Sequence, residues 1–237
     1  MGFVLKRKLY ESAPNMVKSV IRLIPFDWVA GSSYRRVLDR NKSIDNLSAL
    51  EVREYQKKAL GELLNYATRE VPFYQTYQSV VEALPPFEAL KEFPILDKDT
   101  IQRDFIKFLP KCINKIPHYE ISTGGTSGNQ LKFYVEDNSQ AVDLAFVHRV
   151  WSRVGYIPSA RKATFRGVSF ATLGKDVFWQ NNPIYNEVQF SPFHMTEKNL
   201  DSYFKKFIKY RPKYIHGYPS AIDTFAEYIL RNNLGNK

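Results

Sequence analysis

One short segment, Ser122–Gly128, limits the folds open to this chain more than any other. Its three glycines and four hydroxyl residues run in the order Ser122, Thr123, Gly124, Gly125, Thr126, Ser127, Gly128. Tyr119–Ile121 before it and Leu131–Val135 after it have the composition of strands. Glycines allow successive backbone N–H groups to turn toward one anion, and hydroxyls add donors without adding negative charge. We predict a loop between two strands that surrounds the phosphates of a nucleotide.

A tight β-hairpin turn is the alternative, because Gly and Ser populate turns for conformational reasons alone. A two-residue turn would need fewer glycines and no hydroxyls, so the phosphate-binding interpretation is favoured. The segment differs from the P-loop of nucleoside triphosphatases, which ends in Gly-Lys-Ser/Thr and opens a helix. Here Asn129 and Gln130 follow Gly128, and then a strand.

Hydrophobic periodicity predicts an α/β protein with a mixed, mostly parallel sheet flanked by helices. We expect interruptions of an N-terminal helical segment at Pro14, Pro25 and Gly31. Further on, the expected elements are a helix over 47–69, a short helix capped by Asp97, a helix from Asp137 or Asn138 to about Arg153, a strand over 163–170, a helix from Thr196 to Lys209, a strand over 213–216 and a helix that opens at Pro219.

The helix over 47–69 has an apolar stripe formed by Val52, Ala59, Leu60, Leu63, Leu64 and Ala67. The three longer helices after residue 136 have predicted core faces. The first is Val142, Phe146 and Val150; the second is Leu200, Tyr203, Phe204, Phe207 and Ile208; the third is Ile222, Phe225, Ala226 and Ile229.

The turn His216, Gly217, Tyr218, Pro219, Ser220 joins the last strand to the last helix. Ligands of open α/β sheets bind beyond the carboxyl ends of strands, and a helix N-terminus offers unpaired N–H groups and positive potential. We therefore expect this turn near the substrate or nucleotide. The alternative is that Gly217 and Pro219 only shape the connection.

Several ordered segments resemble one family. Thr123–Gly128 resembles the phosphate loop of the adenylate-forming acyl-activating enzymes, and the wider chain resembles the phenylacetate–coenzyme A ligase family, especially its capsule-biosynthesis branch. The further matches, which extend the likeness over roughly residues 50 to 232, are Leu63–Ala67, Val71–Tyr74, Phe93–Lys98 with Ile101, Trp151, Gly155-Tyr156, Arg166-Gly167 and Tyr214–Ile222.

The chain departs from the family pattern in two respects. Gln130 stands where the family usually has proline, which would stiffen the exit of the loop. The family's later motifs, including its C-terminal catalytic lysine, are absent. We therefore expect a fragment, with residues 1–45 as a helical extension and 46–237 as the first part of the adenylate-forming N-terminal domain.

The resemblance implies an AMP-forming acid–thiol ligase, which uses ATP to activate a carboxylic acid and transfers the acyl group to coenzyme A. It implies that residues 122–128 hold the β- and γ-phosphates of ATP, with Lys132 as an added cation or a solvated side chain. Residues 216–220 would contact the substrate, and Tyr218 would wall the acyl pocket. Mg²⁺ ligands would lie beyond this chain, which alone would be inactive. The alternatives are a non-catalytic interaction module or a peripheral membrane factor in polysaccharide biosynthesis.

The net charge of +10 suits polyanionic partners, and ATP and coenzyme A suffice, because no nucleic-acid-binding motif accompanies the charge. Cys112 is the only cysteine, as expected in a reducing cytoplasm. The four histidines lack metal-ligand spacing, so we expect no metal site. Within residues 1–45, Val17, Val20, Ile21 and Ile24 share a helical face beside Lys18 and Arg22. This helix would dock on its own domain or lie on the inner membrane surface.

Overall fold

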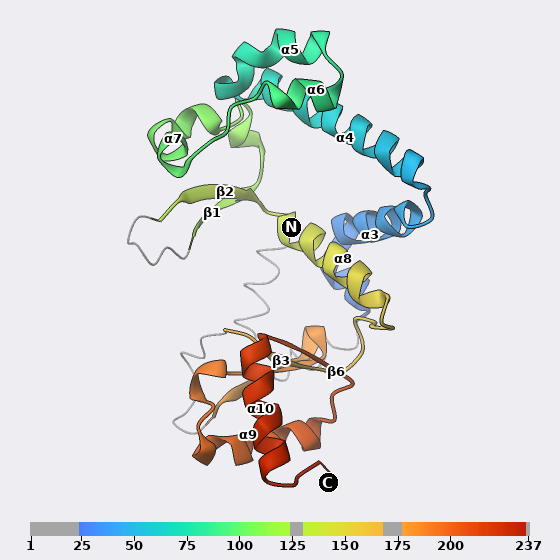
Figure 1. The fold of residues 1–237 in the computed structure, drawn as a ribbon, viewed down its shortest axis with the longest axis vertical. Coiled ribbons are helices and arrows are strands. Elements are labelled where there is room, and N and C mark those ends of the chain that lie inside the picture. Colours follow the sequence, from blue (N-terminus) through green and yellow to red (C-terminus); the bar gives the residue numbers. More distant parts are fainter. Residues whose placement is uncertain (1–23, 124–129, 168–176, 236–237) are drawn as a thin grey trace. The chain divides into compact units, whose positions relative to one another are not determined.

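The computed structural model describes residues 24–123, 130–167 and 177–235. The chain divides into two compact units (Figure 1). The described part of unit 1 covers residues 39–123 and 130–143, and that of unit 2 covers residues 24–38, 144–167 and 177–235. Among the described residues, no helix combines the length and apolarity needed to cross a membrane.

Unit 1 is built on the long helix α4 (Ala49–Glu70), which confirms the helix predicted over 47–69. Ser48 and Glu51 form a capping box at its start, and Val71 ends it in an extended conformation. Short elements follow: the 3₁₀ helix η1 (Pro72–Tyr77), α5 (Gln78–Ala83), α6 (Pro86–Lys91), α7 (Lys98–Arg103), η2 (Phe105–Phe108) and η3 (Ile113–Lys115). As predicted, Asp97 caps α7, accepting a hydrogen bond from the Thr100 N–H.

A two-stranded antiparallel hairpin completes unit 1. Its strands are β1 (His118–Ser122) and β2 (Lys132–Glu136), which confirms both strands predicted around the glycine-rich segment. The register pairs Ser122 with Lys132 at the end nearer the loop and His118 with Glu136 at the other end.

Two helices contribute residues to both units. Helix α3 (Phe26–Ile44) has an interruption at Gly31, as predicted, where φ is +89°. Only glycine adopts such backbone angles readily. Helix α8 (Ser139–Ser152) begins directly after Asn138. Its predicted core face was wrong, because Phe146 and Val150 are 48% and 57% exposed, whereas Ala141, Ala145 and His148 are buried.

Unit 2 contains a four-stranded sheet of order β4-β5-β3-β6, which confirms an α/β fold with mixed strands. The strands are β3 (Lys162–Phe165), β4 (Trp179–Asn182), β5 (Glu187–Phe190) and β6 (Tyr214–Gly217). The central strand β3 is parallel to β5 and β6, and β4 is antiparallel to β5. In the sequence, β4 and β5 were not recognised, and β3 is shorter than predicted, since it ends at Phe165.

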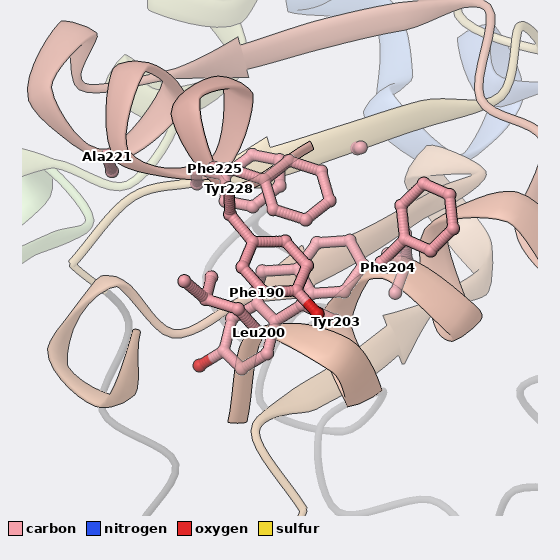
Figure 2. Packing of buried hydrophobic residues seen from close by; sticks show 10 residues of the cluster. Phe190, Leu200, Tyr203, Phe204, Ala221, Phe225 and Tyr228 are labelled. Atoms are coloured by element: carbon pink, nitrogen blue, oxygen red, sulfur yellow. The ribbon is translucent and has the colours of Figure 1, made fainter. Parts of the chain in front are cut away.

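One face of this sheet is apolar and is covered by α9 (Glu197–Tyr210) and α10 (Pro219–Arg231). Figure 2 shows the aromatic layer between strands and helices, in which Phe190 stacks on Tyr203. In the same layer Phe165 contacts Phe225. The predicted faces of both helices are largely confirmed. The exceptions are Ile208, which is 41% exposed, and Ala226, which is also exposed; Ala221 and Tyr228 are buried instead.

Candidate functional site

The described ends of the glycine-rich loop are held together at the neck of the hairpin. The Thr123 N–H donates to the Leu131 carbonyl at 2.9 Å, and the Leu131 N–H donates to Thr123 Oγ1 at 3.1 Å. Ser122 and Thr123 are both exposed. The Thr123 hydroxyl therefore closes the neck as an acceptor, while its own proton remains able to reach a ligand.

The remaining predicted phosphate-binding residues, Gly124, Gly125, Thr126, Ser127 and Gly128, lie outside the described residues. Their role stays a prediction. Lys132, the cation considered beside them, is exposed, and its ammonium lies 3.1 Å from Glu120 Oε1. Such surface pairs contribute little to stability, so Lys132 is free to exchange partners.

The predicted turn of residues 216–220 lies at the carboxyl end of the parallel strands in unit 2. β6 ends at Gly217, and Pro219 occupies the first turn of α10. The Tyr218 N–H donates to the Phe165 carbonyl at 2.9 Å. A Cβ atom on Gly217 would lie 2.5 Å from that carbonyl oxygen. Gly217 is thus required by close packing on β3, which supplies a structural reason for this glycine.

Two exposed aromatic rings stand beside this turn. Tyr218 is 51% exposed and Phe193 is 73% exposed. A Cβ atom on Gly167 would lie 3.5 Å from the Phe193 ring and 3.8 Å from the Tyr218 ring. The two rings therefore border Gly167, where their open faces can stack on a planar group of a ligand. Pro219 and Ser220 are exposed at the same edge.

The second face of the sheet carries an extended polar network that was missed in the sequence. The buried carboxylate of Glu187 is its centre. Its partners are Thr164 Oγ1 (2.9 Å), Gln189 Nε2 (2.7 Å), Asn182 Nδ2 (3.2 Å) and the Lys162 ammonium (3.3 Å). Gln180 extends the network by donating to Gln189 Oε1 at 2.6 Å. Each oxygen of Glu187 thus has partners, as a buried carboxylate requires.

Lys162 is buried beneath aromatic rings as well as paired with Glu187. Its ammonium lies 4.8 Å from the centre of the Trp151 ring and 5.6 Å from that of Tyr156. Aromatic faces stabilise a desolvated cation. The alternation of Lys162 and Thr164 with Ala163 and Phe165 was the available signal, but a strand with a polar face is normally assigned to solvent.

His216 connects this polar face to the predicted turn. Its ring meets Trp151 edge to face at 4.7 Å. Burial, followed by the nearby charges of Lys162 and Arg166, lowers its pKa, while Glu187 opposes the shift. His216 is therefore a neutral imidazole at physiological pH, able to donate through one nitrogen and accept through the other.

His148 is a buried histidine against the same aromatic group. Its Nδ1 lies 2.8 Å from the Tyr34 hydroxyl, and within the described residues its Nε2 has no hydrogen-bond partner. Burial first, and then the charge of Lys162, lowers its pKa to about 4. His148 is thus a neutral packing residue that the helical pattern of α8 failed to identify.

A serine–histidine contact at the end of β5 does not form a nucleophile. Ser191 Oγ lies 2.8 Å from His194 Nδ1, but Ser191 is almost fully buried and its hydroxyl also accepts from the Phe193 N–H. No group of three or more His, Cys, Asp or Glu residues suited to a metal ion occurs in the described ranges.

Comparison with known proteins shows similarity to a capsule-related protein. The chain is 26% identical to Protein CapK of Staphylococcus aureus over 186 residues, which is 76% of this chain and 41% of that protein. The chain thus spans less than half the length of this curated relative. No protein-family model matches the chain. No solved structure matches it either.

Proposed function

We propose that this chain supplies the ATP-phosphate-binding part of an AMP-forming acid–thiol ligase that serves capsule or exopolysaccharide biosynthesis. Similarity to Protein CapK supports the link to capsule biosynthesis. The observation that carries the ligase proposal is the hairpin, which joins two strands through a segment of glycines and hydroxyls with no acidic residue. Such donors suit a polyphosphate.

In this proposal ATP supplies the leaving group that makes a carboxylate reactive. The loop residues 123–128 contribute backbone N–H groups and hydroxyls that hold the β- and γ-phosphates in place. The hydrogen bonds between Thr123 and Leu131 fix the two described ends of this segment. Fixed donors contribute most where negative charge develops, because they need no reorganisation during the reaction.

The turn in unit 2 is proposed to contact the acid substrate. The N-terminus of α10 presents the positive end of the helix dipole, and the rings of Tyr218 and Phe193 offer apolar surface. Coenzyme A would then accept the acyl group. The location that fits these substrates is the cytoplasm.

The test measures acid-dependent release of pyrophosphate and AMP from ATP by the protein as its gene encodes it, with a panel of carboxylic acids. Thr126→Ala combined with Ser127→Ala should slow turnover by about 100-fold or more. The control is Thr76→Ala with Ser79→Ala, which removes two exposed hydroxyls from unit 1. Equal activity of the two double variants would remove the loop from the mechanism.

A further inference from the structure

A hollow lies at the edge of the unit 2 sheet opposite to the turn of residues 216–220. Two adjoining cavities of about 360 and 600 Å³ form it, and both are lined by Asn186, Lys209 and Tyr210. Its strand-side residues Arg161, Asn186 and Lys213 each directly precede a parallel strand, β3, β5 and β6 respectively. We call this feature the amino-edge hollow.

The wall shared by the two cavities is held rigidly. Asn186 has a left-handed backbone, with φ at +43°. Its carbonyl accepts from the Tyr210 hydroxyl at 2.6 Å and from the Lys162 N–H at 3.1 Å, and its side-chain amide donates to the Ser159 carbonyl at 2.5 Å. These hydrogen bonds stabilise the left-handed conformation of Asn186, which asparagine tolerates better than most residues do.

Four cations line the hollow: Arg161, Lys206, Lys209 and Lys213. Within the described part of the chain, none of them forms an ion pair, whereas the neighbouring Lys205 pairs with Asp201 at 2.6 Å. The one carboxylate in the lining, Glu187, is already engaged by Lys162. The hollow therefore gathers positive charge that the described protein does not neutralise.

The positive charges of Lys206 and Lys209 repel each other. Burial, followed by the nearby charge of Lys209, lowers the pKa of Lys206. Both lysines lie in the last turns of α9, where the helix dipole favours cations. The dipole accounts for these two positions, but it leaves Arg161 and Lys213 unexplained.

We propose that the amino-edge hollow binds a small phosphorylated molecule. Its phosphate would lie among Arg161, Lys209 and Lys213, where charge-assisted hydrogen bonds from guanidinium and ammonium groups converge. Its uncharged part would extend along Asn181 and Pro183 in the adjoining cavity. The combined space suits a metabolite-sized ligand. This proposal involves none of residues 122–128 and requires no ligase activity.

Pyridoxal 5′-phosphate is a suitable probe, because its aldehyde condenses with a neutral lysine amine and borohydride reduces the resulting imine to a stable adduct. The full chain is treated with the probe, reduced and mapped by peptide mass spectrometry. We expect Lys206 or Lys209 to be modified ahead of the matched surface lysine Lys198 of α9. Inorganic pyrophosphate should protect them, and sodium chloride at equal ionic strength should not.

A charge-matched pair of variants completes the test. Binding of pyridoxal 5′-phosphate is measured from its absorbance, without borohydride. The double variant Lys209→Gln with Lys213→Gln should weaken this binding by about tenfold or more. Lys58→Gln with Lys198→Gln removes the same charge elsewhere and should leave binding unchanged. Modification of lysines in proportion to exposure, or an equal loss in both variants, would overturn the proposal. Protection of Lys132 reports separately on the loop of residues 122–128.

Discussion

Replacing Gly217 by alanine tests the packing of the turn between β6 and α10. The new Cβ would lie 2.5 Å from the Phe165 carbonyl oxygen, 2.7 Å from Phe165 Cβ and 3.0 Å from its carbonyl carbon. These atoms belong to the central strand, so no flexible side chain can move aside. Gly217 has no positive φ, which makes the penalty steric rather than conformational.

The magnitude follows from the atoms that must move. Overpacking of this kind costs about 1–3 kcal/mol. Displacing the Phe165 carbonyl also weakens its hydrogen bond from the Tyr218 N–H, which adds about 1 kcal/mol. We expect Gly217→Ala to lower the free energy of unfolding by about 2–4 kcal/mol. The melting temperature should fall by roughly 5–15 °C for a chain of this size.

The assay is urea unfolding followed by the fluorescence of Trp151 and Trp179, with a thermal melt in parallel. Gly235→Ala is the matched control, because a Cβ there meets nothing within 4 Å. Its effect should stay within about 0.5 kcal/mol. Equal stability of the two variants would refute the steric reasoning, and a ligand contact would then be the better explanation for Gly217.

Two further predictions concern buried charge. Glu187→Gln leaves the Lys162 ammonium, which is 7% exposed, without its carboxylate partner, and should lower the free energy of unfolding by about 3–5 kcal/mol. The loss should be smaller when Lys162→Met is added. A loss under about 1 kcal/mol for Glu187→Gln alone would contradict this prediction. The folded pKa of His148 is about 4 against 6.5 unfolded, so the unfolded chain binds more protons between these values. Stability should therefore rise with pH through this window, by up to about 3 kcal/mol, and His148→Gln should flatten the rise. An NMR titration that places the His148 pKa near 6.5 would exclude this.

The elements that could be predicted are those whose signals are local. The apolar spacing of α4 and the amphipathic stripe of α9 lie within a few residues of each other along the chain, so the sequence carries them directly. The hairpin followed from composition on both sides of the glycine-rich segment. The turn at Pro219 followed from the preference of proline for the first turn of a helix.

The elements that were missed depend on tertiary contacts. Phe146 and Val150 match a helical core pattern, but Ala141, Ala145 and His148 occupy the buried side of α8. No local rule identifies a histidine as the packing residue.

The partners of Glu187 come from three strands, of which β3, with Lys162 and Thr164, is distant from Glu187 in sequence. Burial of this network depends on Trp151 and Tyr156 covering the sheet. The amino-edge hollow likewise requires the strand order, which brings Arg161, Asn186 and Lys213 to one edge.

The strict alternation along β3 affects how errors in strand pairing are penalised. A register shift of one residue against β5 would turn Phe165 toward Glu187. It would also place Lys162 in the hydrophobic core between the sheet and helices α9 and α10. Both unfavourable placements would occur together, because a register shift of one residue exchanges the two faces of the strand. An incorrect register of β3 is therefore disfavoured twice. It would bury the Lys162 charge among apolar side chains, and it would place the Phe165 ring beside the Glu187 carboxylate.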